Sequence, residues 1–125
     1  MNLLLDTHAL LWWLSDDPTL SSAARDAIAE PGNPVYVSAV SIWEMRIKEA
    51  IGKLSLPSDF ADVLTAQPFA DLPMTAVHAH AVADLPMHHR DPFDRMLIAQ
   101  AAVESLVVVT RDGAFESYGV ELLPA

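Results

Sequence analysis

Residues 91–112, DPFDRMLIAQAAVESLVVVTRD, contain the pattern that decides the fold. Asp91 and Pro92 are typical of a helix start, with an acid at the cap and proline in the first turn. The helix is expected to run to about Ser105. The apolar run Leu106–Thr110 then has the composition of a strand covered on both faces. A helix that leads directly into such a strand favours an α/β protein with a parallel sheet.

The rest of the chain continues this alternation of strands and helices. Strands are expected at residues 2–5, 35–37, 69–72, 106–110 and 120–123. Helices are expected at residues 8–14, 22–30, 40–51, 59–67, 75–83 and 92–105, with Ser21 and Ser58 among the caps and a loop at 84–90. No repeat, low-complexity tract or linker interrupts the pattern. We therefore expect residues 1–125 to form one domain, a three-layer α/β/α sandwich with a short, mostly parallel central sheet.

Four acidic residues stand where a strand gives way to a helix or where a helix begins: Asp6, Glu44, Asp94 and Asp112. In a parallel sheet, the carboxyl ends of the strands and the amino ends of the following helices share one edge, where ligands bind. Two bare carboxylates about 4 Å apart repel by about 4 kcal/mol at an effective dielectric constant of 20. A cluster of them requires protonation or a cation. Because the chain has no cysteine, oxygen ligands indicate a hard ion, Mg²⁺ or Mn²⁺.

Each acid also has a structural explanation when it is taken alone. Aspartate is a favoured helix cap, which fits Asp6 and Asp91. The run Ser41–Glu44 has the capping-box pattern. Asp94 is expected near the positive end of a helix dipole, and Asp112 precedes a glycine, as in many turns. Convergence of the acids on one edge of the sheet is what distinguishes a metal site from a set of caps and turns.

Four segments of the chain resemble the PIN-domain nucleases, and among them the small VapC-type toxins of toxin–antitoxin pairs. The segments are residues 3–7 (LLLDT), 37–44 (VSAVSIWE), 91–101 (DPFDRMLIAQA) and 108–112 (VVTRD), in the family's order and spacing. The resemblance covers nearly the whole chain. It implies a PIN-like fold and cleavage of RNA with Mg²⁺ or Mn²⁺. The ligands it implies are Asp6, Glu44, Asp94 and Asp112, with Asp91 as a further ligand or a cap.

The same resemblance implies partners. They are an antitoxin protein that blocks the site and a second copy of the chain, in a homodimer or a toxin–antitoxin hetero-oligomer. Three hydroxyl residues match positions that accompany the acids in the family, and the resemblance implies that they contact the substrate: Thr7, Ser38 and Thr110. No apolar run is long enough to span a bilayer, and the N-terminus lacks the basic stretch of a signal peptide, so a cytoplasmic protein without a membrane partner is expected.

The net charge of −10 is unusual for a protein that binds RNA, because such binding normally relies on a basic face. Arg90, Arg95 and Arg111 each lie within four residues of an acid at the predicted site. Arg90 and Arg111 are therefore expected to contact phosphate, and pairing with the neighbouring acids is the alternative, above all for Arg95. His88 and His89 fall in the predicted loop close to the predicted site, where a solvated pair is expected and a contact with substrate or phosphate is the alternative.

Other protein classes remain as alternatives. The main one is a PIN-like metal-binding or interaction domain that is not a toxin. A phospho-receiver-like domain requires paired acids after the first strand and a lysine after a late strand, where this chain has Thr7 and Arg111. A phosphatase of the DxD type requires an acid at the position of His8. Both of these classes are disfavoured.

Overall fold

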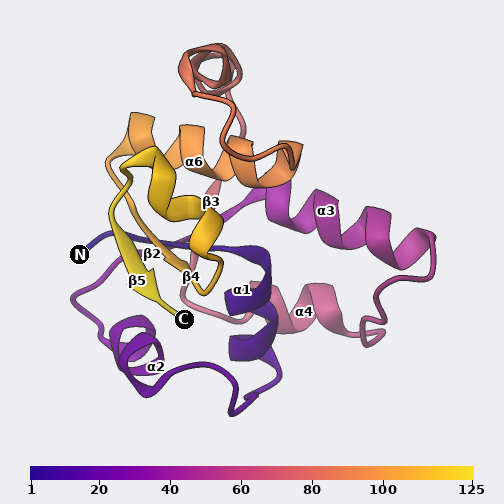
Figure 1. Ribbon diagram of the computed structural model, residues 1–125. Helices are drawn as coiled ribbons and strands as arrows, with labels where there is room; N and C mark the ends of the chain where they lie inside the picture. Colours follow the sequence, from indigo (N-terminus) through magenta and orange to yellow (C-terminus); the bar gives the residue numbers. More distant parts are fainter.

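The computed structural model describes residues 1–125 and contains five parallel strands in one sheet, in the order β3-β2-β1-β4-β5 (Figure 1). The strands are β1 (Leu3–Leu5), β2 (Val35–Ser38), β3 (Ala70–Leu72), β4 (Val107–Thr110) and β5 (Leu122–Pro124). The α-helices are α1 (Thr7–Leu14), α2 (Ser22–Ala29), α3 (Ala39–Ala50), α4 (Phe60–Thr65), α5 (Ala76–Ala81) and α6 (Pro92–Glu104). Two 3₁₀ helices complete the chain, η1 (Val82–Asp84) and η2 (Gly113–Tyr118).

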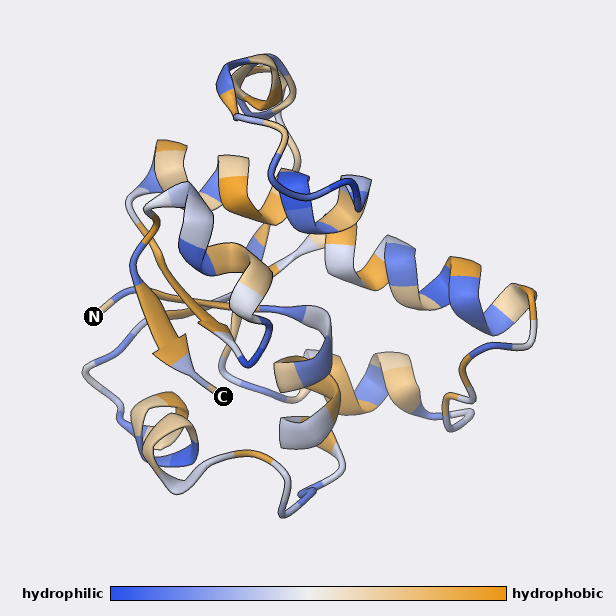
Figure 2. Ribbon diagram, in the orientation of Figure 1, coloured by the Kyte–Doolittle hydropathy of each residue, from blue (hydrophilic) through white to orange (hydrophobic).

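Helices cover the sheet on both faces. Successive residues of a strand point to opposite sides, so one strand contributes to both cores. Leu3 and Leu5 belong to a core cluster with residues of α1, α2, α3 and α4. Leu4, between them, belongs to a second cluster with residues of α6 and η2. Figure 1 shows α6 and η2 on one side of the sheet and α1 and α2 on the other, and the strands are largely orange in Figure 2. The expected α/β sandwich is confirmed, with a sheet that is parallel throughout.

The strand order indicates where on the sheet a ligand would bind. The chain runs from β1 outward to β2 and β3, and then returns to the other side of β1 for β4 and β5. The direction of winding therefore changes between β1 and β4, and ligands bind outside the carboxyl ends of the strands at such a point. Asp6 directly follows β1, and Asp112 follows β4 by two residues. The two acids lie on either side of this switch point.

Several helix boundaries differ from the sequence expectation. Helix α3 begins directly after β2 with Ser38 as its cap, since the Ser38 side chain accepts a hydrogen bond from the amide of Val40. The capping box predicted for Ser41–Glu44 is therefore wrong, and Glu44 lies in the second turn. Ser58 does not cap α4, whose N-cap is Asp59 without a side-chain hydrogen bond. None of the helices combines the length and the apolar character needed to cross a bilayer.

Candidate active site

Asp6 is a buried carboxylate at the start of α1. Its Oδ1 atom accepts a hydrogen bond of 2.8 Å from the amide of Ala9, so the residue caps the helix as its position predicts. Burial raises the pKa of Asp6, and the charge of Asp112 raises it further. Hydrogen bonds from Thr110 and Ala9 and the nearby His8 act in the opposite direction. Asp6 therefore both caps α1 and places a buried, desolvated carboxylate at the switch point.

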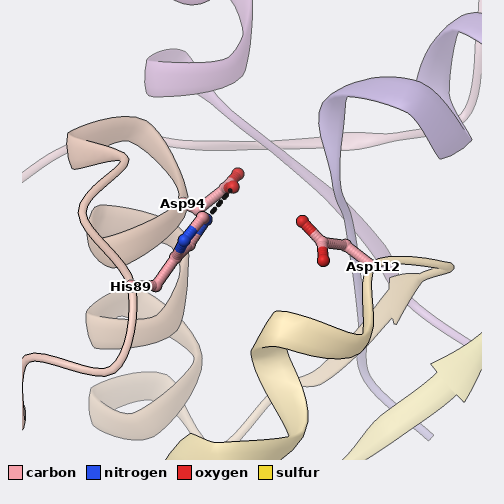
Figure 3. Close-up of side chains that lie close together, drawn as sticks. All are labelled: His89, Asp94 and Asp112. Carbon is pink, nitrogen blue, oxygen red and sulfur yellow. Dashed lines mark hydrogen bonds and ion pairs between the residues drawn. The ribbon is translucent and has the colours of Figure 1, made fainter.

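The side chains of Asp94, His89 and Asp112 face one another, with His89 bonded to Asp94 (Figure 3). One potential ligand atom from each of the three residues lies within 4.8 Å of the other two. The ring Nε2 of His89 is 2.7 Å from Oδ2 of Asp94. Burial raises the pKa of Asp94 to about 6, with further contributions from the charges of Asp91 and Glu44. The bond with Asp94 in turn raises the pKa of His89.

Glu44 is a buried acid held by two neighbours. Thr7 donates a hydrogen bond of 2.8 Å from its hydroxyl to Oε1, and Lys48 pairs with Oε2 one helical turn further along α3. The bond with Glu44 raises the pKa of Lys48, and the charges of Asp91 and Asp94 add to this effect. Glu44 therefore lies within the electrostatic field of the α6 acids without direct contact.

Asp91 caps α6. Its Oδ1 atom accepts hydrogen bonds from the amides of Phe93, at 2.8 Å, and Asp94, at 3.1 Å. One oxygen of this half-buried carboxylate is thus occupied by the helix start. The cap also fixes the position from which the Asp94 side chain leaves the helix.

Two of the three predicted hydroxyl residues contact the acidic positions, and the third does not. Thr7 donates a hydrogen bond to Glu44, and the Thr110 hydroxyl accepts a hydrogen bond of 3.0 Å from the amide of Asp112. Ser38 is fully buried, and its hydroxyl donates to Oε1 of Gln100 at 2.6 Å. Ser38 consequently has no exposed surface for a substrate, because strand β2 carries it into the interior beneath α6.

The model of the PIN domain family matches residues 3–121 of this chain. The chain belongs to the PIN domain family. Ribonuclease VapC22 of Mycobacterium tuberculosis (strain ATCC 25618 / H37Rv) is 32% identical over 122 residues, which span 92% of this chain and 90% of the relative. This PIN domain is therefore of the VapC type.

Solved structures have the same fold. VapBC2 from Rickettsia felis, bound to a DNA fragment from its promoter, superposes on this PIN domain with a TM-score of 0.75 at 13% identity, over 99% of this chain and 98% of that one. DNA-bound VapBC from Salmonella typhimurium has a TM-score of 0.75 at 18% identity, over 98% and 97%. FitAcB from Neisseria gonorrhoeae has a TM-score of 0.66 at 24% identity, over 98% and 96%.

Two of the three arginines near the acids of this PIN domain are bonded to main-chain carbonyls. Arg95 is buried and donates to carbonyls in the segment 82–86. Arg111 donates to the carbonyl of Ala125 from Nε and Nη2, at 2.9 and 2.7 Å, and its guanidinium lies 4.9 Å from the ring centroid of Trp12. Neither pairs with a neighbouring acid. The bonds of Arg111 occupy Nε and Nη2 and leave Nη1 without a partner, and its phosphate contact stays a prediction. Arg90 is exposed, with no hydrogen bond or ion pair from its side chain.

His89 is the member of the site that sequence reasoning missed. The sequence favours a solvated position, yet the ring is half-buried, bonds Asp94 and has a nitrogen within 4.8 Å of a carboxylate oxygen of Asp112. The amide of His89 also donates to the Tyr118 hydroxyl at 2.7 Å, which anchors this part of the loop. A signal was present in the sequence, because His89 stands two residues before the cap of α6, and so short a connection keeps it beside the helix start.

The donor set of this PIN domain fits a hard divalent cation. Two of the three gathered groups are carboxylates, Asp94 and Asp112. Burial raises the pKa of Asp94 and of the nearby Asp6, so a positive charge at the site would lower the cost of their ionised forms. His89 bonds a carboxylate, the arrangement by which neighbouring groups orient ligands in metal sites.

Proposed function

We propose that this PIN domain is an endoribonuclease dependent on Mg²⁺ or Mn²⁺, and that residues 1–125 act as the toxin of a toxin–antitoxin pair. The observation that carries the proposal is that ligand atoms of Asp94, Asp112 and His89 lie within 4.8 Å of one another at the carboxyl edge of the sheet. The buried acids Asp6 and Glu44 lie outside this group, but the charge of Asp112 acts on Asp6 and that of Glu44 acts on Asp94. A relative along nearly the whole length is named a ribonuclease, and this supports RNA as the substrate. Metal dependence follows from the donor set described above.

In this proposal Asp6, Glu44, Asp94 and Asp112 hold the metal, and Asp91 serves as the cap of α6. An ion bound there would coordinate a phosphate oxygen and lower the pKa of a bound water. The side chains around the acids fix their orientation. Thr7 directs Oε1 of Glu44, and His89 directs Oδ2 of Asp94. The edge is therefore preorganised for a charged group before the substrate arrives.

The proposed partners are a small antitoxin and a second copy of the chain. Support for the antitoxin comes from the solved relatives, whose names describe VapBC and toxin–antitoxin complexes. Large apolar side chains are exposed on two helices that each contact α6, with Trp43 of α3 59% exposed and Val77 of α5 61% exposed. Aromatic residues such as Trp43 are enriched in protein interfaces. Action in the cytoplasm follows from the proposed RNA substrate.

The direct test is cleavage of a labelled RNA by the purified protein in EDTA, Mg²⁺ or Mn²⁺. We expect cleavage only with a divalent ion, and a loss of about 100-fold or more in rate for Asp6→Asn and for Asp94→Asn. Asp112→Asn should lose less, because an exposed acid can act on the metal through water. Asp71→Asn, an exposed acid on β3, is the matched control and should cleave normally.

Growth of cells that express the protein gives a second readout. Wild-type protein should arrest growth, and Asp6→Asn or Asp94→Asn should relieve the arrest while the soluble amount of protein stays the same. Arrest that persists with both substitutions would remove the catalytic claim. Binding of RNA or an antitoxin without any cleavage would instead favour the alternative, a non-catalytic interaction domain.

A further inference from the structure

Most cations of this acidic chain are already engaged. Of its seven lysines and arginines, four have bonded guanidinium groups: Arg25 with Asp16, Arg46 with Glu49, and Arg95 and Arg111 with main-chain carbonyls. The ammonium of Lys53 has no ion pair or hydrogen bond. Lys48 pairs with Glu44, and the exposed Arg90 is as free of partners as Lys53, so Lys53 and Arg90 are the two cations that are available to an anion from outside.

Lys53 lines a recess of about 280 Å³ between α1 and the C-terminal end of α3. The other lining residues are Thr7, His8, Leu11, Lys48 and Leu54. Thr7 and Lys48 both bond Glu44, so the recess adjoins the proposed metal site directly. His8 provides a second link, because it is near enough to Asp6 to oppose the rise in the pKa that burial causes.

The local backbone brings the two lysines to the same recess. Helix α3 ends at Gly52, which has a φ of 75°, a conformation that favours glycine because other residues are strained there. The turn lets the amide of Lys53 donate to the carbonyl of Lys48 at 2.8 Å. This is the bond pattern of a helix C-terminus closed by a left-handed residue. Lys53 is thereby folded back over the last turn of α3 towards Lys48.

The hydrogen-bonding capacity of the recess matches a phosphate group. An ammonium has three donors, of which Lys48 uses one for Glu44. The remaining donors of Lys48 and all three of Lys53 are available, and the exposed side chain of His8 also lines the recess. A phosphodiester presents two non-bridging oxygens and one negative charge. It can therefore accept bonds from both lysines at once.

We propose that Lys48, Lys53 and His8 form a subsite for a backbone phosphate of single-stranded RNA, next to the phosphate that is cleaved. The inference rests on the proposed function and specifies how the substrate is held. An RNA strand whose scissile phosphate lies at the acids must continue to one side, and the recess opens on the α1 side of Glu44. The bases of such a strand need not contact the subsite, so it contributes affinity and position and no sequence preference.

The test uses an Asp94→Asn background, which should bind a labelled 12-nucleotide RNA without cutting it. Adding Lys53→Gln should weaken binding by about 3–10-fold and reduce the slope of log affinity against log salt by about 0.7. Arg46→Gln is the matched control, since it removes the same charge from α3 outside the recess, and it should change both quantities much less. Lys48 is left intact because it bonds Glu44.

Neutral methylphosphonate linkages identify the phosphate involved. One neutral linkage should weaken binding in the Lys53-containing protein and have little further effect once Lys53→Gln is present, as two groups in contact behave in a double-mutant cycle. Equal effects of Lys53→Gln and Arg46→Gln would overturn the subsite and leave the nuclease proposal standing. A wild-type protein that neither cleaves nor binds RNA would overturn both.

Discussion

Buried carboxylates make the stability of this protein depend on pH in a defined direction. The pKa of Asp94 is raised to about 6, and that of Asp6 is raised in the same sense, from an ordinary value of 3.8. In the pH window between the unfolded and folded pKa values, the folded chain binds more protons than the unfolded chain. The free energy of unfolding therefore falls as pH rises through this window. Above it, the ionised carboxylates oppose folding unless a cation is bound.

The first prediction follows from this fall in the free energy of unfolding as pH rises. In EDTA at pH 7.5, Asp94→Asn should be more stable than the wild type by on the order of 1 kcal/mol, after allowance for solvent screening. At pH 5 the difference should shrink, because Asp94 is then largely protonated in the folded wild type. Thermal unfolding of both proteins at the two pH values measures it. An Asn variant that is less stable than the wild type at pH 7.5 would contradict the desolvation argument.

A second prediction concerns His89, which orients Asp94 through a bond of 2.7 Å. His89→Ala should reduce metal-dependent cleavage by about 10–100-fold, the usual cost of losing a group that positions a metal ligand. His88→Ala is the control, since His88 packs against Tyr118 and has no bond to an acid. Similar activities of the two variants would show that the His89 bond has no role in the site.

At the scale of elements, substitution of Asp91 shows whether the acid at the start of α6 acts as a helix cap or as a metal ligand. Asp91→Ala should lower the free energy of unfolding by about 1 kcal/mol, because the amides of Phe93 and Asp94 lose their acceptor. Asp91→Ser keeps an acceptor and should restore most of that stability and normal cleavage. If Asp91→Ser is stable but inactive, the residue acts as a ligand and the cap is incidental.

Helix starts were predictable from sequence where one residue alone fits the cap, and not where two compete. Asp91 before Pro92 left a single solution, and α6 begins there. For α3, both Ser38 and Ser41 fit a cap locally, and the choice depends on where strand β2 ends. That end is fixed by pairing with β3, in which Ser38 is opposite Leu72. Such pairing is a tertiary contact, which a local pattern does not contain.

For the whole molecule, the parallel α/β class was predictable because the strands are apolar without alternation. The convergence of Asp94 and Asp112 followed from that class, since carboxyl ends of parallel strands share an edge. The use of the arginines was not predictable. Arg95 and Arg111 bond carbonyls from distant segments, and sequence distance to an acid gives no information about those partners. The recess that Lys48 and Lys53 line was not predictable for the same reason, because it forms between segments that are distant in the sequence.

The central claim is that four acids form one divalent metal site: Asp6, Glu44, Asp94 and Asp112. Titration of the protein with Mn²⁺ tests this claim most directly. Calorimetry should show binding to the wild type and to Asp71→Asn, and a large loss of affinity in Asp6→Asn and Asp94→Asn. At about 100 times the dissociation constant, Mn²⁺ should raise the free energy of unfolding of the wild type by about 2.7 kcal/mol. Absence of binding to the wild type, or equal binding to all four proteins, would contradict the account.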